Sequence, residues 1–178
     1  KEYEIEAEII HEFIRQGGTG HAYSPIIASG HNANILHYND NNQICNDGDV
    51  ILFDFGAEYA NYNADMSRSI PVNGRFTKRQ KDVYSAVLHV MKEATKLLAV
   101  GIVWKTYHEQ VGEIMTEQLV KLGLLSINDV KNQSASYPAY KKYFMHGTSH
   151  HLGLDVHDFA GRYTPFATGN ILTVEPGI

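Results

Sequence analysis

The sequence contains a single cysteine, Cys45, so no disulfide can form within the chain. Absence of disulfides is typical of reducing compartments, and we therefore expect a cytoplasmic protein. A catalytic thiol needs neighbours that lower its pKa, whereas Cys45 is followed only by the turn sequence Asn46–Asp49. We do not expect Cys45 to act as a nucleophile.

Long apolar runs and blocks of basic residues are also missing. Apolar stretches such as Val50–Phe53 have the length of a strand and fall well short of the roughly 20 residues that cross a bilayer. The formal net charge of -5 disfavours a protein that binds nucleic acid. With 178 residues, 43% of them hydrophobic, the chain can form a globular domain with its own core. We expect neither a membrane nor a nucleic-acid partner.

Neither end carries a start or stop signal. Lys1 is followed at once by residues in helical period, without an initiator Met, and Ile178 comes two residues after Pro176. We interpret both ends as cuts through a longer protein, so a missing targeting signal carries little weight.

Apolar residues that recur every three or four positions predict three amphipathic helices. The first covers residues 2–16, and the other two follow capping boxes at Thr77–Gln80 and Thr106–Glu109. Shorter apolar runs predict strands at Ser24–Ala28, Asn34–His37, Val50–Phe55, Ala64–Val72 and Ile171–Glu175. This order of elements predicts an α+β fold in which helices cover a mostly antiparallel sheet.

Asp54 and Asp65 lie on consecutive predicted strands. If these strands form a hairpin whose turn is centred between Tyr59 and Ala60, the two aspartates face each other directly on one side of the sheet. Like charges in that arrangement repel, and a divalent cation between them removes the cost. The alternative is that Asp54 bonds to backbone amides at the end of its strand.

One short segment holds four histidines, His146, His150, His151 and His157. Neutral imidazole is a ligand for Zn, Mn or Co and also a general acid–base group. Gly147 and Gly153 favour a loop or an extended chain here over a helix. We interpret His151 as structural or solvated and keep the other three as candidates for a site.

Glu175 ends an apolar run, a position where a carboxylate does not serve to fill the core. Together with Asp54, Asp65 and His150 it makes an oxygen-rich donor set with a single nitrogen. Such a set favours Mn, Co or Zn in a hydrolytic site. It argues against a structural zinc, which prefers four Cys and His ligands.

At these residues the chain resembles the pita-bread (M24-type) metallopeptidase family, which includes methionine aminopeptidase, prolidase and aminopeptidase P. The segments that carry the resemblance are, in order, Leu36-His37-Tyr38, Asp54-Phe55-Gly56-Ala57-Glu58-Tyr59, Ala64-Asp65-Met66-Ser67-Arg68-Ser69, His146–Asp158 and Thr173–Gly177. The resemblance covers essentially the whole chain and is closest to bacterial aminopeptidase P. It implies the pita-bread fold, with a curved, mostly antiparallel sheet, and hydrolysis of the N-terminal Xaa-Pro peptide bond.

The resemblance also implies a site with two divalent ions, Mn in the first place, with Zn and Co as alternatives. The implied ligands are Asp54 on one ion, Asp65 bridging both, and His150 and Glu175 on the other. The residues implied to position the substrate and stabilise the transition state are His37, His146 and His157. A hydroxide held between the ions would attack the scissile carbonyl, and Glu175 would carry a proton to the leaving group.

The family has two parts that residues 1–178 lack: an N-terminal domain and a second bridging glutamate beyond Val174–Gly177. We therefore interpret residues 1–178 as a partial catalytic domain, which by itself holds metal weakly and has little activity. The parent protein is expected to act on proline-containing peptides and to form a homo-oligomer.

Two other interpretations stay open. Prolidase shares the motifs but cleaves only dipeptides, so the distinction depends on how the cleft is closed. A non-catalytic pita-bread binding module, or a metal-free enzyme of the creatinase type, is disfavoured because all four ligands expected within this length are present.

Overall fold

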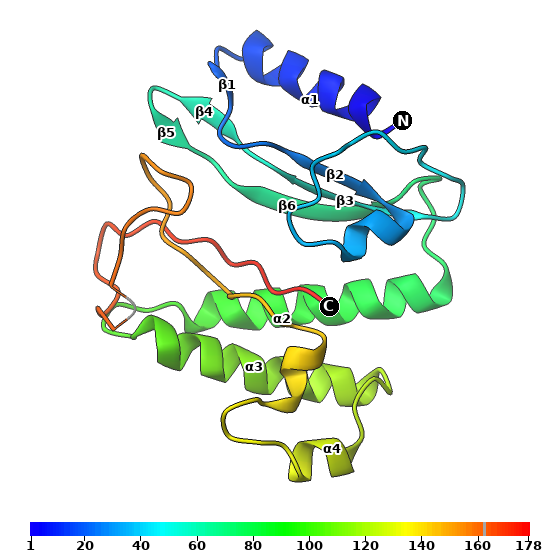
Figure 1. Cartoon of the computed structure of the whole chain (residues 1–178). Helices are drawn as coiled ribbons and strands as arrows, with labels where there is room; N and C mark the ends of the chain where they lie inside the picture. The colour runs from blue at the N-terminus through cyan, green and yellow to red at the C-terminus, as the bar shows by residue number, and fades with distance from the viewer. Residues whose placement is uncertain (162) are drawn as a thin grey trace. The chain divides into compact units, whose positions relative to one another are not determined.

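The computed structural model describes residues 1–161 and 163–178 (Figure 1). Its helices are α1 (Glu2–Arg15), α2 (Lys78–Leu97), α3 (Trp104–Lys121) and α4 (Ile127–Lys131), with the 3-10 helices η1 (Gly30–Asn34) and η2 (Ala139–Lys142). Its strands are β1 (Gly20–His21), β2 (Ile26–Ser29), β3 (Val50–Phe55), β4 (Ala57–Tyr59), β5 (Tyr62–Asn63) and β6 (Met66–Pro71). Within this described part, none of the helices combines the length and hydropathy that crossing a membrane requires.

The chain divides into two compact units, each with its own packing. The first unit comprises Lys1–Gln80 and Leu152–Asp158, and the second comprises Lys81–His151 and Phe159–Ile178.

The first unit contains two three-stranded sheets, in the orders β1-β4-β5 and β2-β3-β6. Every strand pair in them is antiparallel, as predicted. The helix α1 packs against β1 and β2 (Figure 1). Ile26, Ala28 and Tyr38 form the buried apolar cluster beside β2.

The hairpin that carries the two aspartates turns one residue later than predicted. Tyr59 pairs with Tyr62, and the two turn residues, Ala60 and Asn61, have φ angles of 52° and 68°. A two-residue turn with both residues in the left-handed region matches the twist of the flanking strands, and Asn tolerates that region well.

This shift moves Asp65 relative to its predicted partner. Asp54 pairs with Ser67, so the direct pairing of Asp54 with Asp65 predicted from the sequence is wrong. Asp65 comes two residues before Ser67, which makes the two aspartates diagonal neighbours across the ladder.

The core of the second unit lies between α2, α3 and the segment around η2. Its buried apolar side chains are Val90, Ala94, Tyr107, Val111, Met115, Leu119, Leu125, Tyr140, Phe144 and Phe166. Most of the helical members belong to the apolar stripes that predicted these helices. Gly112 allows α3 to pack closely against Tyr140 of η2, because a Cβ atom at this position would collide with the Tyr140 ring.

Element boundaries agree with the sequence in some places and not in others. The Thr77 amide donates to Gln80 Oε1 at 2.8 Å, which confirms that capping box at the start of α2. The second box is wrong, because α3 already begins at Trp104 and Thr106 lies inside it.

The strands predicted at residues 34–37 and 171–175 are also wrong. Residues 34–37 form the end of η1 and a turn instead of a strand, and their apolar members, Ile35 and Leu36, are exposed. Residues 171–175 form an isolated bridge, Leu172 to His151, instead of a regular strand.

Glu2 is a fully buried carboxylate at the start of α1. Its oxygens accept hydrogen bonds from the Ser29 amide (2.8 Å), the Gln43 amide (2.9 Å), the Tyr38 hydroxyl (2.7 Å) and Asn32 Nδ2 (3.1 Å). Burial pushes the pKa of Glu2 up, but these donors outweigh it and hold the pKa below its usual value. Glu2 therefore ties α1 to the end of β2 and to the loop after η1.

We predict that Glu2→Gln lowers the free energy of unfolding by about 2–4 kcal/mol at pH 7, because an amide group then faces buried donors. In the native protein this contribution is complete above the unfolded pKa of about 4.3 and is lost as the pH falls through the lower folded pKa. Urea denaturation from pH 7 to pH 3 measures both effects. Glu8→Gln, on the exposed side of α1, is the control and is expected to change stability by less than about 0.5 kcal/mol. A Glu2→Gln variant as stable as the native chain at pH 7 would contradict the assignment.

Candidate functional site

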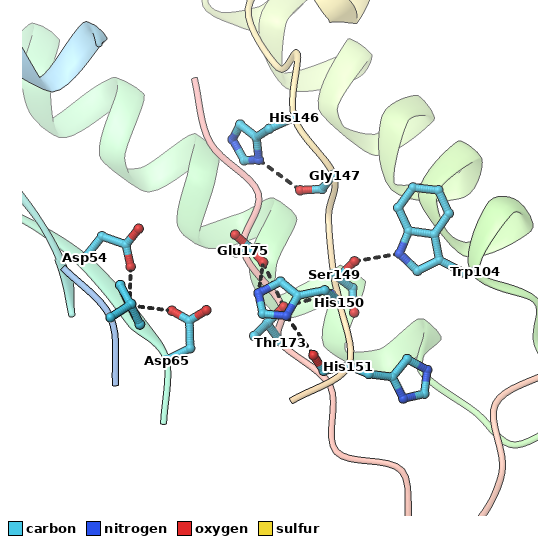
Figure 2. A network of polar contacts seen from close by, with 11 residues as sticks. Asp54, Asp65, Trp104, His146, Gly147, Ser149, His150, His151, Thr173 and Glu175 are labelled. Atoms are coloured by element: carbon cyan, nitrogen blue, oxygen red, sulfur yellow. Dashed lines mark hydrogen bonds and ion pairs between the residues drawn. The ribbon is translucent and has the colours of Figure 1, made fainter. Parts of the chain in front are cut away.

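Asp54 and Asp65 meet at one phenolic hydroxyl. The Tyr23 hydroxyl lies 2.6 Å from Asp54 Oδ1 and 2.8 Å from Asp65 Oδ1. The two aspartates are labelled in Figure 2. The two carboxylate oxygens are therefore no farther apart than the sum of these distances. The structure brings the two predicted ligands together, although by a diagonal arrangement instead of a direct one.

The chemistry of this trio favours a cation. Burial, and then the hydrogen bond to Asp54, raise the pKa of Tyr23 far above its usual value, so its hydroxyl keeps its hydrogen. That one hydrogen can be donated to only one carboxylate at a time. Two carboxylates within this span offer oxygens of the kind that hard divalent cations bind.

Gly56 explains how the chain segments of the two aspartates approach so closely. A Cβ atom at this position would collide with the carbonyl oxygen of Ala64, which is a backbone atom and cannot rotate away. The same close passage continues with the Ala64 amide, which donates to the Ala57 carbonyl at 2.9 Å. Only glycine fits between the two strands here.

His150 and Glu175 lie in the second unit, on two extended segments that run antiparallel. The Thr173 amide donates to the His150 carbonyl at 3.0 Å, and the Glu175 amide donates to the Thr148 carbonyl at 2.9 Å. The His150 amide donates to Thr173 Oγ1, which in turn donates to Glu175 Oε1 at 2.7 Å. The Thr173 hydroxyl thereby orients the Glu175 carboxylate toward His150 (Figure 2).

The hydrogen on the His150 ring can be placed from its partner. His150 Nδ1 lies 2.9 Å from the His151 carbonyl oxygen, which can only accept, so Nδ1 carries the hydrogen. In the neutral ring Nε2 then has a lone pair, and it lies 3.2 Å from Glu175 Oε1. Two acceptors at this distance need a proton or a cation between them. An imidazole that donates one N–H to a backbone carbonyl is also the usual arrangement of a metal-binding histidine.

The other three predicted histidines are placed as follows. His146 Nδ1 lies 2.8 Å from the Gly147 carbonyl, and its ring packs edge-on against Phe144 with 5.0 Å between centroids. His37 is exposed on the turn after η1, with a φ of 57° that is uncommon for a non-glycine residue. His157 is also exposed.

Within the first unit, the segment of His157 is bound to β5. The Asn63 amide donates to the Gly153 carbonyl at 2.9 Å, and Asn63 Nδ2 donates to the Leu154 carbonyl at 2.7 Å. The hairpin that leads to Asp65 and the segment that leads to His157 are thus joined by two hydrogen bonds.

The structure therefore resolves the predicted ligands into two pairs, one in each unit. Within either unit, the described residues contain no group of three or more His, Cys, Asp or Glu side chains placed to hold a metal. Convergence of all four ligands on common ions stays a prediction.

Two contributing side chains were missed at the level of sequence. Tyr23 precedes β2, and no spacing rule connects it to Asp54 or Asp65. Thr173 could have been found, because it lies two residues before Glu175 and residues so spaced share a face of an extended chain.

Comparison with known proteins gives consistent matches along the whole chain. The model of Metallopeptidase family M24 matches residues 1–178. The Xaa-Pro aminopeptidase of Haemophilus influenzae is 44% identical over 182 aligned residues, which are 99% of this chain and 42% of that protein. The Xaa-Pro aminopeptidase of Escherichia coli is 42% identical, over 99% of this chain and 41% of that protein.

Solved structures agree with these sequences. Zn-substituted E. coli aminopeptidase P in complex with product has a TM-score of 0.89 at 41% identity, over 98% of this chain and 40% of that one. Pseudomonas aeruginosa aminopeptidase PepP has a TM-score of 0.89 at 40% identity, with the same coverage of 98% and 40%. The predicted α+β pita-bread fold is confirmed. The chain spans about two fifths of the length of these relatives.

We predict that Tyr23→Phe lowers the free energy of unfolding by about 1–3 kcal/mol in the presence of a chelator, since the carboxylate pair loses a shared donor. Thermal denaturation with a metal chelator present measures the change. Tyr62→Phe, whose side chain is 60% exposed, is the matched control and is expected to leave the midpoint unchanged. Equal midpoints for the two variants would show that the Tyr23 hydroxyl does not hold the pair.

Proposed function

Because this chain belongs to metallopeptidase family M24, we propose that it forms part of an Xaa-Pro aminopeptidase, which hydrolyses the bond between an N-terminal residue and a following proline. Two relatives named Xaa-Pro aminopeptidase align with 99% of this chain. The whole protein's activity is part of the proposal, since the chain spans only part of each relative.

The observation that carries the proposal is the close approach of metal-ligating side chains in two pairs. Asp54 and Asp65 share the single hydrogen of Tyr23. His150 Nε2 and Glu175 Oε1 face each other at 3.2 Å, with the ring hydrogen placed on Nδ1. Each pair thus has acceptors directed at a common point, which is the arrangement that a cation stabilises.

We propose that Asp54, Asp65, His150 and Glu175 together hold two divalent ions. When bound, such ions lower the pKa of a water molecule and polarise the carbonyl of a peptide. Three carboxylates and one imidazole form a hard donor set, so Mn is the ion we propose, with Zn and Co as alternatives.

Glu175 has a second proposed role, as the group that moves a proton. Its Oε1 accepts from the Thr173 hydroxyl, which the His150 amide already orients as an acceptor. About a third of the Glu175 side chain stays exposed, at 33%, so its carboxylate can receive a proton from a reacting group and pass it to the proline nitrogen. An amine leaving group needs that proton because it departs poorly as an anion.

His37, His146 and His157 are proposed to bind the substrate. His37 and His157 are exposed, and their imidazoles can donate to peptide carbonyl oxygens. Such side-chain contacts suit a substrate whose scissile amide lies before proline, because this amide has no N–H for backbone pairing.

Several finer expectations stay predictions. Residues 1–178 by themselves are proposed to bind metal weakly and to have little activity, because a further bridging glutamate is expected outside them. We likewise propose that the intact protein forms a homo-oligomer and is cytoplasmic.

We predict that the intact protein cleaves a tripeptide Xaa-Pro-Yaa with a kcat/KM at least about 100-fold above that for Xaa-Ala-Yaa. A chelator is expected to abolish the reaction, and added Mn to restore it. Released amino acid measured by chromatography gives the rates. Cleavage of the Xaa-Pro dipeptide alone would favour the prolidase interpretation, and turnover unaffected by a chelator would contradict metal dependence.

We predict further that Asp65→Ala in the intact protein lowers kcat at least about 100-fold, because both ions lose a ligand. Asp40→Ala, at an exposed carboxylate of the same unit, is the control and is expected to keep native activity. Circular dichroism checks that both variants fold. Appreciable turnover by folded Asp65→Ala protein would remove Asp65 from the metal site.

A further inference from the structure

The first two turns of α3 hold the segment that leads to His150. Trp104 Nε1 donates to the Ser149 carbonyl at 2.6 Å (Figure 2). One helical turn later, His108 Nδ1 lies 2.8 Å from the Thr148 hydroxyl. Two consecutive residues directly before His150 are therefore each bound by a side chain of the same helix.

These two side chains are themselves held in place. The Trp104 and His108 rings are stacked, with 5.1 Å between centroids and planes only 9° apart. Phe144 and Tyr140 lie against His108, at 5.7 Å and 6.1 Å between centroids. Thr148, the partner of His108 on the segment, is fully buried. Neither ring can turn without disturbing this aromatic cluster.

The contacts of α3 continue directly into the ligand pair. The Thr148 carbonyl accepts the Glu175 amide at 2.9 Å, and Ser149 is the residue before His150. A Cβ atom on Gly147 would lie 3.3 Å from Trp104 Cζ2, so the segment is also pressed against the indole. A displacement of Thr148 or Ser149 along α3 would therefore shift His150 and strain the hydrogen bond that the Glu175 amide donates.

We propose that Trp104 and His108 are positioning residues that set the alignment of residues 148–150 against residues 173–175. In this way they fix the spacing between His150 Nε2 and Glu175 Oε1 before any ion binds. The effect on metal rests on the proposed function, since it assumes that His150 and Glu175 are ligands. The effect on alignment does not, because it concerns backbone hydrogen bonds alone.

Four variants in the intact protein test this role. Trp104→Phe keeps an aromatic ring and removes the N–H donor. His108→Phe keeps the ring stacking and removes Nδ1, whereas His108→Asn restores a polar atom near the position of Nδ1. Tyr107→Phe is the matched control, because this change in α3 removes a buried hydroxyl that has no hydrogen-bond partner among the described residues.

The first measurement is amide hydrogen exchange without metal. Trp104→Phe and His108→Phe are expected to lower the protection of the Thr173 and Glu175 amides about tenfold, the effect of weakening one hydrogen-bonded contact. The Val111 and Met115 amides, in the middle of α3, are expected to stay within about twofold of native values. His108→Asn is expected to recover most of the lost protection, and Tyr107→Phe to show none of the loss.

The second measurement is calorimetric titration with Mn. Loss of a residue that orients a ligand typically weakens metal binding about 10–100-fold, and this is the rise in Kd expected for Trp104→Phe and His108→Phe. His108→Asn is expected to bind Mn close to the native affinity.

The outcomes separate this proposal from the proposed function. Native protection at Thr173 and Glu175 in both Phe variants overturns the positioning role, whatever the metal affinity. Equal loss of protection at Val111 and Met115 also overturns it, since that pattern means general destabilisation. If the native protein binds no Mn, Zn or Co, the proposed function fails, and the exchange result alone decides whether α3 sets the alignment.

Discussion

The central constraint in this protein is the close approach of carboxylate and imidazole groups in two pairs. Asp54 and Asp65 direct two carboxylates at one Tyr23 hydroxyl, and His150 and Glu175 direct a ring nitrogen and a carboxylate at each other. The groups of each pair repel unless a proton or a cation lies between them. A divalent ion replaces this repulsion by attraction. Metal binding at these pairs is the proposal that accounts for this feature, and the proposed chemistry follows from it.

The surrounding structure is organised to hold these costly pairs in place. Gly56 allows the strand of Asp54 to pass close against the carbonyl of Ala64, the residue before Asp65. In the second unit, the Thr173 hydroxyl and the indole of Trp104 bind the segments of Glu175 and His150. Groups that repel must be kept together by the rest of the fold, so residues that are not ligands set the geometry of the pairs.

Sequence patterns predicted elements well where local chemistry decides them. Thr77 and Gln80 form the capping box that their spacing indicates, since a cap depends on atoms within one helical turn. The similar pair Thr106 and Glu109 lies inside α3, which already starts at Trp104. Residues 34–37 look like a strand by their apolar pair, Ile35 and Leu36, but both side chains are exposed. Apolar character alone does not determine which segments are buried.

By itself, the sequence determined the family, the α+β fold class and the identity of the candidate ligands. Motifs such as His146–Asp158 are recognised from residue types and their spacing, without knowledge of how the chain folds. Only the tertiary structure decided that the hairpin turns at Ala60 and Asn61, that Tyr23 lies between the aspartates, and that α3 binds the segment before His150. These features depend on contacts between residues far apart in the chain. Their geometry is set by strand register and side-chain packing, which no local spacing encodes.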